Sequence, residues 1–125
     1  MPAKKSKATT FAIPPLKKGE TYIGAIVGAD GKGHHVILLA GDEKKNWKDA
    51  VAWAKKKGGD LPDRVEQALL FRDHKAKFEG TWYWSNTEYA GDADCAWIQS
   101  FGDGGQFITR KSFDYRCRAV RRVAI

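Results

Sequence analysis

Apolar and polar positions divide the chain into an extended first part, a helical middle and an extended last third. Residues 21–27 are rich in β-branched and aromatic side chains, and residues 35–40 form a nearly continuous apolar run after a turn at residues 29–33. This arrangement predicts a β-hairpin, because the turn residues tolerate positive φ angles. The continuous apolar run indicates that the second strand is covered on both faces.

Two helices are predicted in the middle of the chain. The first has an apolar stripe at helical spacing, formed by Trp47, Ala50, Val51 and Ala54. Gly58 and Gly59 end this helix. The second helix begins near Asp63, with Glu66 three residues on as the partner in a capping box. Its apolar side is expected on Val65, Ala68 and Leu69, together with Leu70 or Phe71.

From Gly80 onward the hydrophobic period changes to two, with turns at residues 91–92 and 102–105. An N-terminal hairpin, two helices and then short antiparallel strands predict an α+β fold. The length of 125 residues suits one domain. We assign this domain to residues 19–125, after a basic arm at residues 1–18 that we expect to be flexible.

Several motifs in the helical and C-terminal parts resemble one family in the same order. They are residues 61–70, 82–88, 96–101, 104–106, 111–112 and 116–123. The family is that of the Lcl C-terminal-like domains, small bacterial and phage domains of unknown function labelled by the number 1566. The resemblance covers about residues 20–125.

This resemblance implies a C-type-lectin-like fold, similar to the formylglycine-generating enzyme and to the variable proteins of diversity-generating retroelements. In such a fold the terminal strands pair, two helices flank the sheet, and an upper set of strands displays a binding surface. By analogy with the variable proteins, the displayed residues are Ile98, Ser100, Asp103, Phe107 and Thr109. Trp82 and Tyr83 are added because neighbours in a strand point to opposite faces, which leaves at least one of them available to a ligand.

We expect a non-enzymatic module, encoded by a phage or prophage, that binds a protein or a cell-surface glycan on this surface. The paired active cysteines of the formylglycine-generating enzyme have no counterpart here. His34 and His35 are adjacent in a predicted strand, which makes a poor metal clamp. The acids of residues 86–94 indicate turns, since the motifs of calcium-dependent lectins are missing. We expect no metal and no cofactor, and leave a homo-oligomer open.

The cysteines allow two states. Cys95 and Cys117 both fall in predicted strands, so a cross-strand disulfide is geometrically possible. Reduced thiols are more common in a chain without a secretory segment, and we expect no such segment here.

No apolar run approaches the roughly 20 residues of a membrane helix, so membrane insertion is not expected. These features place the protein in the host cytoplasm or in the phage particle.

The net charge of +7 is uneven, because residues 1–18 contain five lysines and no acid. This supports an alternative function, that of an intracellular phage accessory protein binding a host protein or nucleic acid. The residues assigned to polyanion binding are Lys4, Lys5, Lys7, Arg116 and Arg118. The C-terminal arginines have a second interpretation, which is pairing across the fold with Asp114, Glu66 or Asp63.

Overall fold

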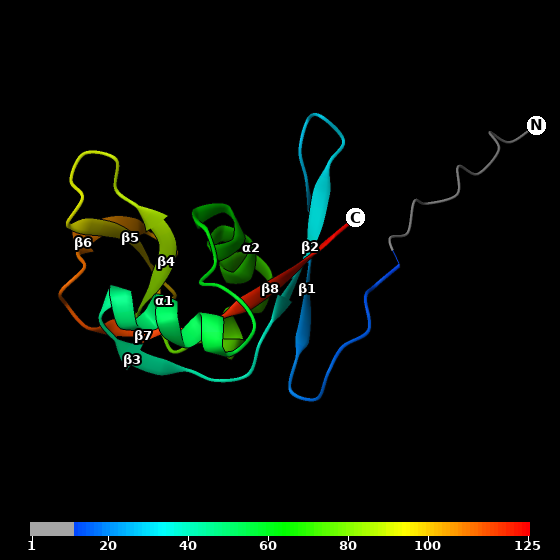
Figure 1. The fold of residues 1–125 in the computed structure, drawn as a ribbon, viewed down its shortest axis with the longest axis horizontal. Coiled ribbons are helices and arrows are strands. Elements are labelled where there is room, and N and C mark those ends of the chain that lie inside the picture. The colour runs from blue at the N-terminus through cyan, green and yellow to red at the C-terminus, as the bar shows by residue number, and fades with distance from the viewer. Residues whose placement is uncertain (1–11) are drawn as a thin grey trace, which may run out of the picture.

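The computed structural model describes residues 12–125 and shows an α+β protein with two α-helices and two sheets (Figure 1). The strands are β1 (Thr21–Val27), β2 (Gly33–Leu38), β3 (Glu43–Lys45), β4 (Trp82–Glu88), β5 (Cys95–Ser100), β6 (Gln106–Arg110), β7 (Tyr115–Cys117) and β8 (Val120–Ala124). The helices are α1 (Trp47–Lys56), α2 (Arg64–His74) and the short 3-10 helix η1 (Lys75–Lys77). Lys4, Lys5 and Lys7 lie outside the described residues.

The predicted N-terminal hairpin is confirmed, because β1 and β2 pair in antiparallel orientation. β2 is the central strand of a three-stranded sheet in the order β1-β2-β8. Residues 36–39 are buried, as the continuous apolar run indicated. β8 pairs with β2. The first and last strands therefore share a sheet without the direct pairing that the family resemblance implied.

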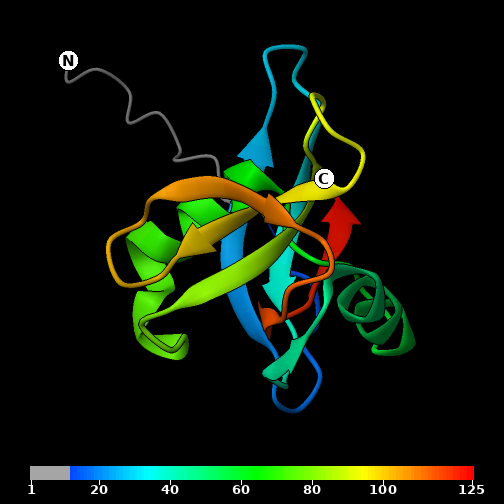
Figure 2. The same ribbon diagram turned by 90° about the vertical axis from the view of Figure 1, so that its left-hand side faces the viewer.

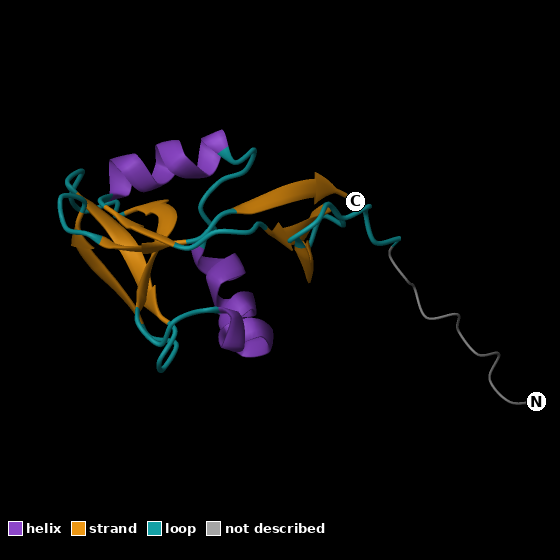
Figure 3. Cartoon of the chain, turned by 90° about the horizontal axis from the view of Figure 1, so that it is seen from below, coloured by secondary structure: helices purple, strands orange, loops and turns teal. Residues whose placement is uncertain are grey.

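The other strands form a five-stranded sheet in the order β3-β7-β4-β5-β6, with the two helices on its opposite faces (Figure 3). Trp84 of β4 belongs to a core cluster with Ala50 and Ala54, which confirms the predicted stripe of α1. Its neighbour Tyr83 points the other way and packs in a second cluster with Leu70 of α2. In the view of Figure 2, α2 lies to the left of the sheet and α1 to its right.

The start of α2 was predicted correctly, and Leu70 is buried with Leu69 packed beside it, as expected, but Val65 and Ala68 are exposed. Asp63 is the N-cap, and the capping box with Glu66 is formed. Val65 is 62% exposed, whereas Glu66 and Gln67 are buried. The side-chain amide of Gln67 donates to the carbonyls of Tyr83 at 3.3 Å and Trp84 at 3.1 Å. The buried side of α2 therefore includes two polar residues with partners in addition to Leu70.

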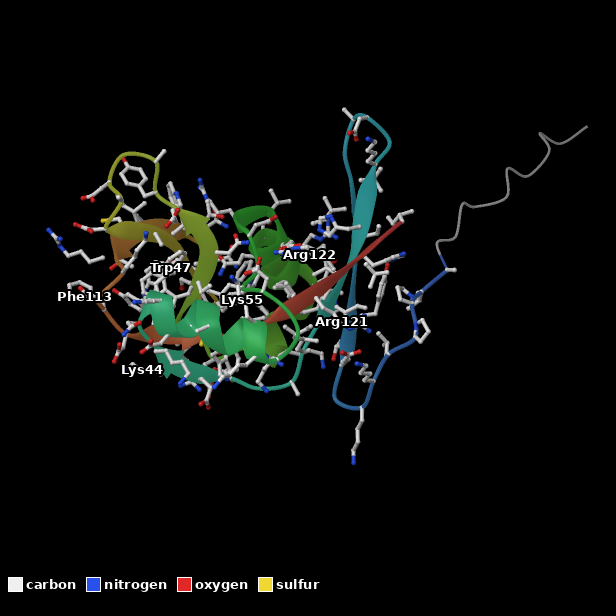
Figure 4. The ribbon with its side chains drawn as sticks, viewed as in Figure 1. Lys44, Trp47, Lys55, Phe113, Arg121 and Arg122 are labelled. Carbon is white, nitrogen blue, oxygen red and sulfur yellow. The ribbon has the colours of Figure 1, made fainter. Side chains whose placement is uncertain are left out.

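Glu66 joins α2 to both strands of the smaller sheet that lie beside it. Its carboxylate accepts hydrogen bonds from Arg122 of β8 at 2.6 and 2.7 Å. Nε2 of His34, on β2, lies 2.9 Å from the same carboxylate. Burial alone raises the pKa of Glu66, but the hydrogen bonds from Arg122 and from the Asp63 backbone outweigh it and lower the pKa. Figure 4 shows that Arg122 points toward α2, whereas Arg121 leaves the strand on the other side.

Replacing Glu66 by Gln should destabilise the fold strongly. The change removes a buried charge from its partners and leaves Arg122 with Asp60, so we expect a loss of about 3 kcal/mol in the free energy of unfolding. Glu88→Gln is the matched control, because Glu88 forms an exposed ion pair with Lys111 and should cost less than about 1 kcal/mol. Urea unfolding measures both, and equal losses in the two variants would contradict this role of Glu66.

Stability should also fall at low pH through Glu20. Hydrogen bonds from Arg121 and from the Lys17 backbone lower the pKa of Glu20 from 4.5 to about 2. Because the folded pKa is the lower one, this carboxylate stabilises the fold above about pH 4.5, and the contribution is lost as the pH falls toward 2. The free energy of unfolding, measured against pH, should therefore fall less in Glu20→Gln than in the wild type. Parallel profiles would contradict the assignment.

Candidate functional site

The strand register brings five of the predicted ligand-binding residues to one face of the five-stranded sheet, namely Trp82, Ile98, Ser100, Phe107 and Thr109. Trp82 pairs with Ser100 across β4 and β5. On β6, Phe107 pairs with Ile98, and Thr109 pairs with Ala96. Residues paired across neighbouring strands, and residues two apart along a strand, share a face. Trp82, Phe107 and Thr109 therefore lie on the face that also carries Trp84, which is the side covered by α1.

Trp82, Phe107 and Thr109 form a partly exposed aromatic surface with Tyr115 of β7. Phe107 is 61% exposed, and its ring meets that of Trp82 edge to face, with 5.6 Å between the centroids. The hydroxyl of Tyr115 lies 3.2 Å from Oγ1 of Thr109, so the Tyr115 side chain on β7 contacts β6. We call Trp82, Phe107, Thr109 and Tyr115 the aromatic patch.

A surface cavity of about 260 Å³ adjoins the aromatic patch. It is lined by Lys44, Thr81, Trp82, Asp114, Tyr115 and Arg116. Phe113, which precedes Asp114, is also exposed, and Figure 4 shows it at the same end of the molecule as Lys44. Aromatic walls next to a few polar groups suit a ligand that has an apolar face and a polar edge.

Two predicted residues lie on the expected face but are not displayed. Ile98 is 4% exposed and Ser100 is 8% exposed, so the expectation that they are presented on the surface is wrong. Trp82 and Tyr115 pack against the core cluster that contains Ile98. Ser100 has a structural role, because its hydroxyl accepts a hydrogen bond from the backbone of Gly102 at 3.1 Å. Both residues form the floor below the aromatic patch.

Tyr83 and Asp103 are also placed away from the aromatic patch. Tyr83 is buried on the α2 side, where its hydroxyl donates to Asp42 at 2.5 Å. Burial and this hydrogen bond raise the pKa of Tyr83 to about 12. Asp103 is exposed in the turn between β5 and β6, and its carboxylate accepts from the backbone of Gly105 at 2.9 Å. Of the neighbouring pair Trp82 and Tyr83, the tryptophan is thus the one available to a ligand.

Tyr115 was missed by the sequence analysis. The alternation of the C-terminal segment drew attention to its arginines, and Tyr115 is only the start of a three-residue strand. Its place on the aromatic patch depends on β7 lying between β3 and β4. The link between β7 and β4 is a parallel pairing of Tyr83 with Arg116. No local signal in the sequence predicts such a contact.

The C-terminal arginines are held by internal partners. Arg116 donates to Asp42 at 2.8 Å, and Arg118 donates to the carbonyls of Leu39, Gly41 and Lys77. Pairing of this segment with Glu66 is confirmed through Arg122. The other carboxylates used are those of Asp42, Asp60 and Glu20. The two arginines assigned to polyanion binding therefore already have structural partners.

Both cysteines are free thiols in this structure, and they differ in their surroundings. Cys95 is partly exposed, whereas Cys117 is buried, and burial raises the pKa of Cys117 to about 12.

Within residues 12–125, no cluster of three or more His, Cys, Asp or Glu side chains is placed to hold a metal ion. In the same residues, no helix has the length and apolar character needed to cross a membrane.

The chain matches none of the models of known protein families, and a search of the curated proteins found no match either. The candidate site therefore rests on the geometry of the aromatic patch and of the cavity beside it.

The two thiols should react at very different rates with a disulfide reagent such as DTNB. We expect Cys95 to react in the folded protein, because it is partly exposed. Cys117 should react only as the protein unfolds, because burial keeps it protonated and inaccessible. Cys95→Ser should remove the fast phase of the reaction and leave the slow one. Two fast phases in the wild type would contradict the burial of Cys117.

Proposed function

We propose that this chain is a non-enzymatic binding module, encoded by a phage or prophage, that holds a protein or a cell-surface glycan on its aromatic patch. The observation that carries the proposal is Phe107, which is 61% exposed yet fixed against Trp82. Large rings held rigidly at a surface give much contact area at a small entropic cost. The module would act in the host cytoplasm or on the phage particle.

The chemistry of the cavity supports binding. Trp82 and Tyr115 offer ring faces and edges, while Thr81 supplies a hydroxyl. Lys44 and Asp114 add one charge of each sign at the rim. A sugar ring can use such a site by laying its C–H face on an aromatic ring and pointing its hydroxyls at the polar groups. A peptide can use it by inserting one apolar side chain.

The strands beneath the aromatic patch hold its side chains in place, which also favours binding of a partner. Trp82, Phe107 and Tyr115 stand on three strands of one sheet, and the floor beneath them is closed by Ile98 and Ser100. A binding site built on strands is better fixed than one built on loops. Binding then loses little free energy to the ordering of the patch.

We further propose that the fold is C-type-lectin-like and that the chain is related to the Lcl C-terminal-like domains. Two helices on opposite faces of the larger sheet support this proposal, as does the shared sheet of β1 and β8. Phe107 and Thr109 belong both to the surface implied by the variable proteins and to the aromatic patch. Since a fold does not define a ligand, the ligand class rests on the patch itself.

Phe107→Ser should reduce ligand binding without unfolding the protein. An exposed anchor of this kind contributes about 2 kcal/mol, so we expect a loss of roughly thirtyfold in affinity. The measurement is binding of the labelled chain to printed arrays, one of cell-surface glycans and one of proteins. Hits on one array and not on the other identify the ligand class.

Val65→Ser is the matched control, because Val65 is 62% exposed but lies on α2, on the other side of the sheet. It should bind as the wild type does. Equal binding by the Phe107 and Val65 variants would contradict the assignment of the aromatic patch. No binding of the wild-type chain to either array would contradict the proposed function.

A further inference from the structure

Lysines and arginines differ in their use within this fold. Three C-terminal arginines form ion pairs with carboxylates elsewhere in the fold. The pairs are Arg116 with Asp42, Arg121 with Glu20 and Arg122 with Glu66. Within residues 12–125, Lys111 is the lysine that forms an ion pair, with Glu88. The acids are thus engaged mainly by arginines. The positive charge that remains accessible belongs mainly to lysines, with the exposed Arg110 as an exception.

Five of these lysines line two hollows near the C-terminal end of α1, and three of the five lie beside Trp53. Trp53 lines a surface hollow of about 210 Å³ together with Lys45 and Lys56. Nζ of Lys57 lies 5.3 Å from the centroid of the Trp53 ring. Lys57 also lines a second hollow, of about 240 Å³, with Lys17 and Lys18.

We call Lys17, Lys18, Lys45, Lys56 and Lys57 the lysine ridge. It draws on the loop before β1, on β3 and on the end of α1, which lie along the lower part of the view in Figure 1. Residues far apart in the sequence therefore contribute to one surface.

The acids beside the lysine ridge do not cancel its charge. Both carboxylate oxygens of Glu20 accept hydrogen bonds from Arg121 at 2.9 Å, so this acid is matched by a residue outside the ridge. Asp49 lines the first hollow, where its carboxylate accepts from the side chain of Asn46 at 3.2 Å. Asp49 in the first hollow and the exposed Glu43, two residues before Lys45 on β3, are then the acids that face five ammonium groups. A polyanion laid along the ridge would relieve their mutual repulsion.

We propose that the lysine ridge binds the phosphate backbone of a single-stranded nucleic acid. Ammonium groups are strongly hydrated point charges that bind phosphate without demanding a fixed geometry. Trp53 packs partly against the core, and the part of its ring that remains exposed beside Lys56 and Lys57 can stack on a base. Lysines around an aromatic ring are typical of single-strand sites. A membrane surface would use large apolar side chains beside the lysines. Leu16, next to Lys17, is 43% exposed, so binding to vesicles is one outcome of the test.

This proposal does not depend on the aromatic patch or on its ligand. It also differs from the use of Arg116 and Arg118, which are held by internal partners. Lys4, Lys5 and Lys7 precede the lysine ridge in the sequence. Substituting these three lysines separates their contribution to nucleic-acid binding from that of the lysine ridge.

The test is fluorescence anisotropy with the full-length chain and a labelled oligo-dT of about 20 nucleotides, long enough for a single-strand site. If all five lysines contact phosphates, the plot of log affinity against log salt should have a slope of about −3.5. The double variant Lys56→Gln/Lys57→Gln should make this slope shallower by about 1.4 and weaken binding at low salt. Lys17→Gln/Lys18→Gln serves as a second, independent pair with the same expected change.

Lys32→Gln/Arg110→Gln is the matched control, because it removes the same charge from two exposed residues in the β1–β2 turn and at the end of β6. The β1–β2 turn lies at the opposite, upper end of the view in Figure 1. This variant should keep the wild-type slope, and thermal unfolding should confirm that all variants remain folded.

Several results would overturn the proposal. They are the absence of oligo-dT binding, equal slopes in the ridge and control variants, and loss of binding confined to Lys4→Gln/Lys5→Gln/Lys7→Gln. Tighter binding to a duplex of the same length, or to vesicles containing phosphatidylserine, would equally reject a single-strand site. None of these results bears on ligand binding at the aromatic patch, which is assayed separately.

Discussion

The buried carboxylate of Glu66 is the constraint on which the rest of this fold depends. A charge in the protein interior is costly unless it is paired and fully hydrogen-bonded. Arg122 supplies two such bonds and the Asp63 backbone a third, while His34 completes the set. Because these partners come from β8, from the start of α2 and from β2, satisfying the charge fixes all three elements relative to one another.

The position of α2 then sets the position of the larger sheet. Gln67, the residue after Glu66, donates to two carbonyls of β4 and so anchors the central strand. With α2 on one face, α1 covers the other face around Trp84 and leaves the region of Trp82 and Phe107 exposed. The aromatic patch is therefore a consequence of how far α1 extends over the sheet, and its rigidity comes from the strands beneath it.

Local signals in the sequence predicted the elements well. The hairpin, the apolar stripe of α1 and the capping box at Asp63 each depend on residues close together in the chain. The burial of Glu66 and Gln67 on α2 could not be predicted in this way, because these polar residues are satisfied by partners in β8 and β4. The analogy with the variable proteins placed Ile98 and Ser100 on a surface, although Trp82 and Tyr115 close over that region. The lysine ridge joins three separate segments, so no single window of sequence predicts it.

A double-mutant cycle on Glu66 and Arg122 tests the central claim most directly. The free energies of unfolding of Glu66→Gln, Arg122→Gln and the double variant are compared with that of the wild type. If the buried pair fixes α2 against β8, the coupling energy should be about 2 kcal/mol or more, so that the double variant loses much less than the two single losses combined. A coupling energy below about 0.5 kcal/mol would show that the two side chains act independently, and would contradict the account.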